Sequence, residues 1–153
     1  MQVPPLSYCK VIWIETKWSR GSDYFWYTEF MINYDDFKKV EIRAGKILSA
    51  EKIPDTDKLL KLAVDFAEQS QTILEDGTAV TKPVVRQIVS GISAYFPDPA
   101  ILVGKTCMFV TNLEPRVIKG YESNGMLFAV SDASGNFSLL EPNPSIVPGT
   151  KAA

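Results

Sequence analysis

The chain has 153 residues, enough for one domain with one hydrophobic core, and its 46% hydrophobic and 22% charged residues are typical of soluble globular proteins. It contains no histidine, which excludes Ser-His-Asp and Cys-His catalysis, HExxH zinc sites and histidine-based pH switching. The formal net charge of −2 argues, taken as a total, against nucleic acid as a partner.

The first thirty residues differ in composition from the rest, because they hold all three tryptophans. Residues 10–16 and 24–30 are rich in β-branched and aromatic types, and a turn signal lies between them at 20–23. Two interpretations stay open: a β-hairpin, or translated upstream sequence before a true start at Met31. We therefore expect an N-terminal extension over 1–31 and a folded domain over 32–153.

The next segments have the pattern of short strands. Residues 39–53 begin with an alternation of charged and apolar side chains over 39–44, and Gly45 then interrupts the run as glycine does at a bulge or a sharply coiled strand. Residues 54–57 form a turn signal. Residues 60–66 then alternate strictly, which predicts a strand with one buried face.

Further strands are expected along the rest of the chain. Residues 72–80 place Asp76-Gly77 between two β-prone runs, a strong hairpin signal. Only residues 97–103 suggest a helix, with two prolines near its start. The sequence therefore predicts an all-β protein, a small closed or partly closed barrel with one short helix. The remaining β-prone runs are 84–92, 106–113, 126–130 and 137–140.

The charges are unevenly distributed along the chain. Residues 36–62 carry a net charge of +2 and residues 82–120 one of +3, whereas residues 63–81 carry −4. A protein that is negative overall can therefore still present a positive surface. Taken alone, the same charges also fit the solvated face of an ordinary barrel.

No motif indicates catalysis. The glycines of 120–125 lack the spacing of a phosphate-binding loop, and Cys9 and Cys107 form no CxxC pair. Cys107 lies in an apolar run and is expected to be a small buried hydrophobe. We predict no catalytic residue, cofactor or metal site. The longest apolar run near the start, 11–14, is too short for a signal peptide or a membrane span, so we expect a cytoplasmic protein.

Residues 112–126 form a polar connection between two apolar strands. Arg116 and Lys119 are suited to hold phosphates, while Asn112 and Ser123 offer neutral hydrogen bonds. Loops on a rigid barrel are frequent binding sites, so this segment is the strongest candidate for one.

Several blocks, taken in order, resemble the tRNA-binding domain family. This module occurs at the C-terminus of many bacterial methionyl-tRNA synthetases, as free-standing small proteins and in eukaryotic synthetase cofactors. The resemblance covers about residues 32–151. The blocks that carry it are DFKKVEIRAGKI (36–47), DKLLKL (57–62), RQIVSGI (86–92), the 112–126 segment and the terminal VPG (147–149).

The resemblance implies a five-stranded OB-fold, a Greek-key barrel that binds tRNA by shape and phosphate backbone. It also implies a homodimer, no catalysis, and action free-standing or in trans with a methionyl-tRNA synthetase catalytic subunit. The alternative is a dimeric peptide-binding secretion chaperone, because a chaperone subfamily shares this barrel.

The tRNA-binding positions that the resemblance implies are Arg43, Lys46, Asn112, Arg116, Lys119, Ser123 and Met126. Arg43 and Lys46 are three apart, so an undistorted strand points them to opposite faces and only a bulge at Gly45 brings both to one groove. Met126 is either a soft apolar surface for a base or sugar, or a core residue.

Two segments depart from the family pattern. Residues 67–83 insert a longer, acidic hairpin, which would repel RNA if it folded over the groove. The tryptophan-rich first thirty residues have no counterpart.

Overall fold

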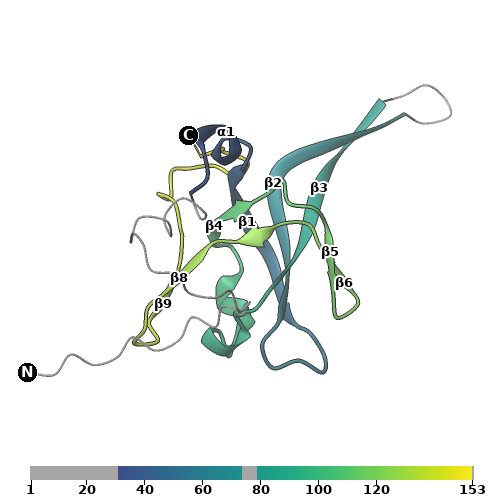
Figure 1. The fold of residues 1–153 in the computed structure, drawn as a ribbon. Coiled ribbons are helices and arrows are strands. Elements are labelled where there is room, and N and C mark those ends of the chain that lie inside the picture. Colours follow the sequence, from purple (N-terminus) through teal and green to yellow (C-terminus); the bar gives the residue numbers. More distant parts are fainter. Residues whose placement is uncertain (1–30, 74–78, 153) are drawn as a thin grey trace, which may run out of the picture. The chain divides into compact units, whose positions relative to one another are not determined.

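Five antiparallel strands curl into a half-barrel in the computed structural model of the chain, which describes residues 31–73 and 79–152 (Figure 1). Their order in the sheet is β3-β2-β1-β4-β7. The prediction of an all-β OB-fold barrel is confirmed. The N-terminal hairpin expected over 10–30 and the Asp76-Gly77 turn lie outside the described residues. The strands are β1 (Ile42–Lys52), β2 (Leu60–Ile73), β3 (Ala79–Ser90), β4 (Thr106–Val110) and β7 (Met126–Leu127).

Short elements connect these strands. The helix expected over 97–103 is present as the 3-10 turn η2 (Pro99–Leu102), in which Asp98 accepts a hydrogen bond from the Ala100 N–H at 3.0 Å. The described residues hold one short α-helix, α1 (Tyr34–Phe37), and a second 3-10 turn, η1 (Ser93–Tyr95), both too short to show helical periodicity in the sequence. Two small hairpins complete the described residues: β5 (Arg116–Ile118) with β6 (Tyr121–Ser123), and β8 (Ala129–Ser131) with β9 (Phe137–Leu139).

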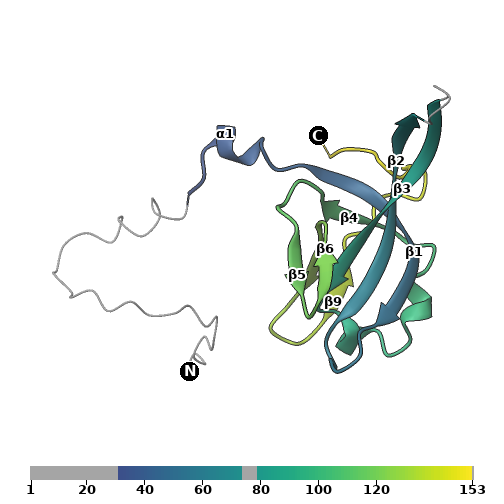
Figure 2. The ribbon, with the colours of Figure 1, turned by 90° about the vertical axis from the view of Figure 1, so that its right-hand side faces the viewer.

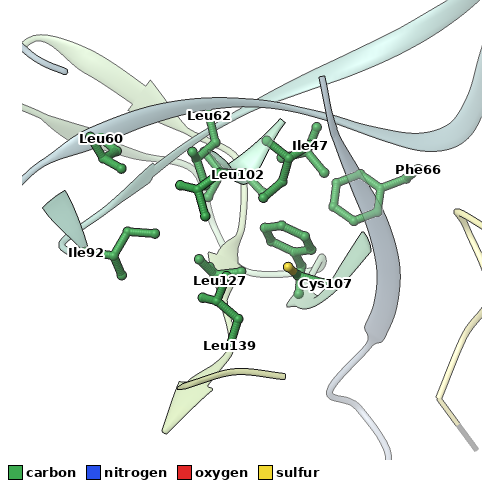
Figure 3. Packing of buried hydrophobic residues seen from close by; sticks show 12 residues of the cluster. Ile47, Leu60, Leu62, Phe66, Ile92, Leu102, Cys107, Leu127 and Leu139 are labelled. Atoms are coloured by element: carbon green, nitrogen blue, oxygen red, sulfur yellow. The ribbon is translucent and has the colours of Figure 1, made fainter. Parts of the chain in front are cut away.

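The core lies inside the curled sheet (Figure 3). The alternation in β2 sends every second side chain inward, as the sequence predicts, and none of these is more than 1% exposed: Leu60, Leu62, Val64 and Phe66. The Phe66 ring meets Phe109 of β4 edge to face, with 5.4 Å between centroids. Cys107 is fully buried in the same cluster, as expected.

Close packing against the core, and not a bulge, explains why glycine occupies position 45. The β1–β4 register runs without interruption through it, and the irregularity in β1 lies between Ile47 and Ser49, so the interpretation of Gly45 as a bulge, one of the two alternatives, is wrong. A Cβ at Gly45 would lie 2.5 Å from the Phe66 ring. Glycine therefore lets a core aromatic approach the strand, and Arg43 and Lys46 stay on opposite faces of β1.

The inserted hairpin is a two-stranded arm that continues β2 and β3 beyond the barrel (Figures 1 and 2). A bulge between Asp65 and Glu68 starts it, and Ala67 adopts a left-handed φ of 55° while its N–H donates to the Asp65 carboxylate at 2.7 Å. We use "the arm" for the paired residues 68–73 and 79–84. It projects away from the barrel.

The C-terminal segment takes the place that β2 leaves on β1. The Ala44 N–H donates to the Thr150 carbonyl, and the Gly149 N–H donates to the Ala44 carbonyl, both at 2.8 Å. Gly149 has a φ of 86°, and a Cβ there would lie 2.5 Å from the Phe66 carbonyl oxygen. The edge of β1 is therefore covered where β2 bends outward into the arm.

Candidate nucleic-acid interface

The connection expected between residues 112 and 126 folds as the β5–β6 hairpin. Its turn is Lys119-Gly120, with φ of 52° and 82°, as in the two-residue turns whose twist suits a hairpin. Arg116 and Lys119 are both exposed. Within residues 31–73 and 79–152, neither cation has an ion-pair partner.

Ser123 anchors this hairpin to β3, which lies beside it in both views (Figures 1 and 2). The side chain is 5% exposed; its Oγ accepts the Val89 N–H at 3.0 Å and donates to the Gly125 carbonyl at 3.1 Å. Gln87 adds two contacts: its Nε2 donates to the Glu122 carbonyl at 2.7 Å, and its carbonyl accepts the N–H of the residue after Ser123 at 2.8 Å. The Ser123 hydroxyl is therefore already hydrogen-bonded to backbone groups within the protein.

Asn112 anchors the other end of the same segment. Its Oδ1 accepts the Glu41 N–H at 2.8 Å, and its Nδ2 donates to the Lys39 carbonyl. These bonds tie the end of β4 to the chain that enters β1. The two predicted hydrogen-bonding residues therefore bracket residues 113–122, and the two predicted phosphate-binding cations lie between them.

Arg43 lies in a charge network with Glu41, Glu68 and Arg86. Its Nε is 2.8 Å from Glu41 Oε1 and its Nη1 is 3.5 Å from Glu68 Oε1. Arg86 binds the same Glu68 carboxylate with two nitrogens and donates to the Thr111 carbonyl at 2.6 Å. The positive charge of Arg43 is therefore compensated by carboxylates.

The pKa of Glu41 is held below its ordinary value by this network. The largest cause is the Thr111 hydroxyl, which donates to Glu41 Oε1 at 2.9 Å, and the Arg43 guanidinium adds to it. Both contacts favour the ionised carboxylate.

Lys46 contrasts with Arg43. It points from the opposite face of β1, is exposed, and has no ion-pair partner among the residues the structure describes. Arg43 and Lys46, which the resemblance assigns to one tRNA-binding site, therefore lie on opposite faces of β1.

Met126 begins β7 opposite Val110 and is 48% exposed, so its interpretation as a core residue is wrong. The preceding Gly125, with φ of 147°, passes so close to the Val110 carbonyl that a Cβ would lie 2.8 Å from that oxygen. Val117 on β5 is 73% exposed. Apolar side chains therefore accompany the exposed cations.

Sequence reasoning missed the residues that hold the hairpin in place. Gln87 lies in the quoted RQIVSGI block, but nothing local marks it as a partner of residues 122–124. Lys61 Nζ lies 5.7 Å from the Tyr121 ring centroid, a cation–π contact between β2 and β6. The aromatic residue directly after Lys119-Gly120 was the available signal.

The described residues hold no group of three or more His, Cys, Asp or Glu side chains placed to bind a metal ion. No helix in the described part of the chain is long and apolar enough to cross a membrane.

The arrangement at β5–β6 offers cations, hydrogen-bonded anchors and exposed apolar groups, which suit a phosphate-rich polymer with accessible bases.

Comparison with known proteins decides the family. Residues 42–151 match the family model described as "Putative tRNA binding domain". This chain belongs to the tRNA-binding domain family. The methionine–tRNA ligase of Methanoregula boonei is 47% identical over 121 residues, which are 79% of this chain and 15% of the ligase. The chain thus spans about 15% of the length of the curated relatives it matches.

Two solved structures superpose on the barrel. A MetRS-related protein from Pyrococcus horikoshii has a TM-score of 0.65 and 32% identity, covering 80% of this chain and 98% of that one. The chaperone CsaA of Bacillus anthracis has a TM-score of 0.61 and 26% identity, covering 80% and 99%. The same barrel therefore occurs in a MetRS-related protein and in a protein named as a chaperone.

Proposed function

We propose that this chain binds tRNA without catalysing a reaction, and that Arg116 and Lys119 on the β5–β6 hairpin contact its phosphates. The observation that carries the proposal is the contrast between two kinds of cation. Arg43 and Arg86 are neutralised by Glu41 and Glu68, whereas the two hairpin cations are exposed and have no ion-pair partner in the described part of the chain.

The remaining candidate residues fall into two groups: those suited to contact tRNA, and those whose side chains hold the fold around the site. Lys46 is exposed and suited to a further phosphate contact, and Met126 to an apolar contact with a base or sugar. Asn112, Ser123 and Arg43 act through the fold, because their polar groups bond to other parts of the barrel. Binding by a few cations on an acidic protein is expected to be modest and sensitive to salt.

We infer that the module acts with a methionyl-tRNA synthetase catalytic subunit in trans, or free-standing, in the cytoplasm. The similarity to methionine–tRNA ligases over 79% of this chain supports the link to that enzyme. Addition of the full chain to a synthetase that lacks such a domain should then lower its KM for tRNA, while its kcat for amino-acid activation stays unchanged.

The direct test is a gel shift of the full chain with bulk tRNA. Binding that weakens as salt rises, and that is competed by unlabelled tRNA, supports the proposal. Absence of any shift at low salt would contradict it.

A chaperone function is the second candidate, favoured by the likeness to CsaA. It predicts that the full chain suppresses aggregation of an unfolded client protein. Suppression that excess tRNA leaves unchanged would favour this function over tRNA binding.

A further inference from the structure

One face of β3 runs from the candidate interface out onto the arm. The odd-numbered residues of this strand, from 79 to 89, project from the same face, because side chains alternate and the extra residues of the bulge belong to β2. At the barrel end the β5–β6 hairpin contacts this face, where Gln87 Nε2 donates to the Glu122 carbonyl at 2.7 Å and Val89 is 7% exposed. Farther out the face is uncovered, and Val85 is 47% exposed.

On the arm, this face carries uncharged polar side chains. Gln69 and Gln71 of β2 lie opposite Pro83 and Thr81 of β3, and residues directly opposite one another share a face. All four are exposed. Among the described residues, no hydrogen bond engages the side chains of Gln69, Gln71 or Thr81. The face therefore offers amide and hydroxyl groups that both donate and accept hydrogen bonds.

The acidic character of residues 63–81 does not extend to this part of the arm. Of the two charged residues in the arm, Glu68 is bound by Arg86, and Lys82 has no ion-pair partner among the described residues. Asp65 lies on the same face nearer the barrel, where its carboxylate accepts the Ala67 N–H at 2.7 Å. The paired arm thus leaves one positive charge uncompensated, which favours a polyanion as its partner.

We propose that this face of the arm lies along the minor groove of a double-helical stem of the tRNA, a contact that rests on the function proposed above. The minor groove of A-form RNA is wide and shallow and displays 2′-hydroxyls and base edges, whereas the major groove is too deep and narrow for side chains to read. A two-stranded ribbon can enter a groove of a double helix. Uncharged amides and hydroxyls match 2′-hydroxyls, which also both donate and accept.

A double helix fits the arm better than single-stranded RNA does. Proteins that bind single strands stack the bases on aromatic side chains, and the arm contains no aromatic residue. Six residues of each strand are paired beyond the bulge, which at about 3.3 Å per residue extends the ribbon by roughly 20 Å. The ribbon continues β3 past the β5–β6 hairpin (Figures 1 and 2). One stem can therefore contact the hairpin cations and continue along the arm.

The first test compares two double variants of the full chain in titrations with tRNA. Gln69→Ala with Gln71→Ala removes both amides from the proposed face, and Ser70→Ala with Thr72→Ala truncates two exposed residues of the same strand on the opposite face. We expect the glutamine pair to bind tRNA about fivefold more weakly or worse, through two lost hydrogen bonds, and the control pair to bind like the wild type. Because no charge is lost, the slope of log affinity against log salt should stay at the wild-type value.

The second test locates the RNA on the arm. In a Cys9→Ser background, a photoactivatable aryl azide is attached to Gln71→Cys or, as the control on the opposite face, to Thr72→Cys. Irradiation in the presence of tRNA should cross-link the first variant to nucleotides of a double-helical stem, and the second variant should remain uncross-linked.

The outcomes separate this inference from the proposed function. Wild-type affinity in the glutamine pair, equal cross-linking from both cysteine positions, or cross-links confined to loops would overturn the contact with the arm. If tRNA binding then still depended on Arg116 and Lys119, the proposed function would stand without the arm. Absence of tRNA binding by the wild type would refute both.

Discussion

The Oγ atom of Ser123 accepts a hydrogen bond from the N–H of Val89 at 3.0 Å, which fastens the β5–β6 hairpin to β3. At the other end of the segment, Asn112 Oδ1 accepts a hydrogen bond from the Glu41 N–H and fastens the segment to the chain that enters β1. The cations on the hairpin therefore project from a segment that is held at both ends. A hairpin restrained in this way loses little conformational freedom when it meets a ligand.

Replacement of Ser123 should weaken tRNA binding through the position of the hairpin. Ser123→Ala leaves the buried Val89 N–H without its acceptor, at a cost of about 1–3 kcal/mol to the local structure. We expect lower tRNA affinity together with faster hydrogen exchange of the Val89 amide. The matched control is Ser131→Ala, which removes an exposed hydroxyl on β8.

A double-mutant cycle separates this role from direct contact with RNA. If Ser123 acts by positioning, its replacement has no further effect on tRNA affinity once Arg116 and Lys119 are both alanine. An equal loss of affinity in both backgrounds would show that the hydroxyl contacts tRNA itself.

Arg116→Ala and Lys119→Ala should each reduce tRNA affinity and its dependence on salt. Loss of one phosphate contact makes the slope of log affinity against log salt shallower by about 0.7–0.9. Titrations at several salt concentrations measure this slope. Lys105→Ala is the control, because it removes the same charge from a lysine paired with Glu141 at 2.7 Å. Slopes that match the wild type in both hairpin variants would refute the phosphate contacts.

Glu41 should make stability depend on acid pH. Because the folded state lowers its pKa below the ordinary 4.5, the carboxylate stabilises the fold above that pH and the contribution disappears as pH falls through the lowered pKa. Glu41→Gln should reduce the free energy of unfolding at neutral pH, and the deficit should shrink in acid.

Urea denaturation at pH 7 and pH 3 measures this difference. Glu114→Gln, an exposed acid outside the network, serves as the comparison. A deficit of equal size at both pH values would mean that the amide disrupts packing rather than charge.

Cys107 should be unreactive in the folded protein. Burial is the main cause that raises the pKa of its thiol to about 11, and full burial also denies access to reagents. In a Cys9→Ser background, iodoacetamide at pH 8 should label the protein only after denaturant is added. Mass spectrometry follows the reaction, and labelling at the rate of a free thiol would contradict the buried position.

Much of the barrel could be predicted because its signals are local. The alternation of residues 60–66 defines one buried face, and the prolines and Asp98 of 97–103 define a helical turn. Shorter elements could not be predicted: β5 and β6 have three residues each, too few for periodicity against the polar composition of residues 112–126. The strand expected over 126–130 divides at Phe128, whose N–H donates to the Met108 carbonyl and whose carbonyl accepts the Leu140 N–H, partners that the local sequence does not show.

The sequence by itself determined the family, the inward face of β2 and the placement of exposed cations at Arg116 and Lys119. Only the tertiary structure decided which polar groups are already hydrogen-bonded or ion-paired within the protein. Asn112 meets the Glu41 backbone 71 residues away, Ser123 meets Val89 34 residues away, and Arg43 meets Glu68 across the bend of β2. A side chain's type shows what it can bond, but the folded barrel decides what lies within reach, because each partner comes from a distant part of the chain.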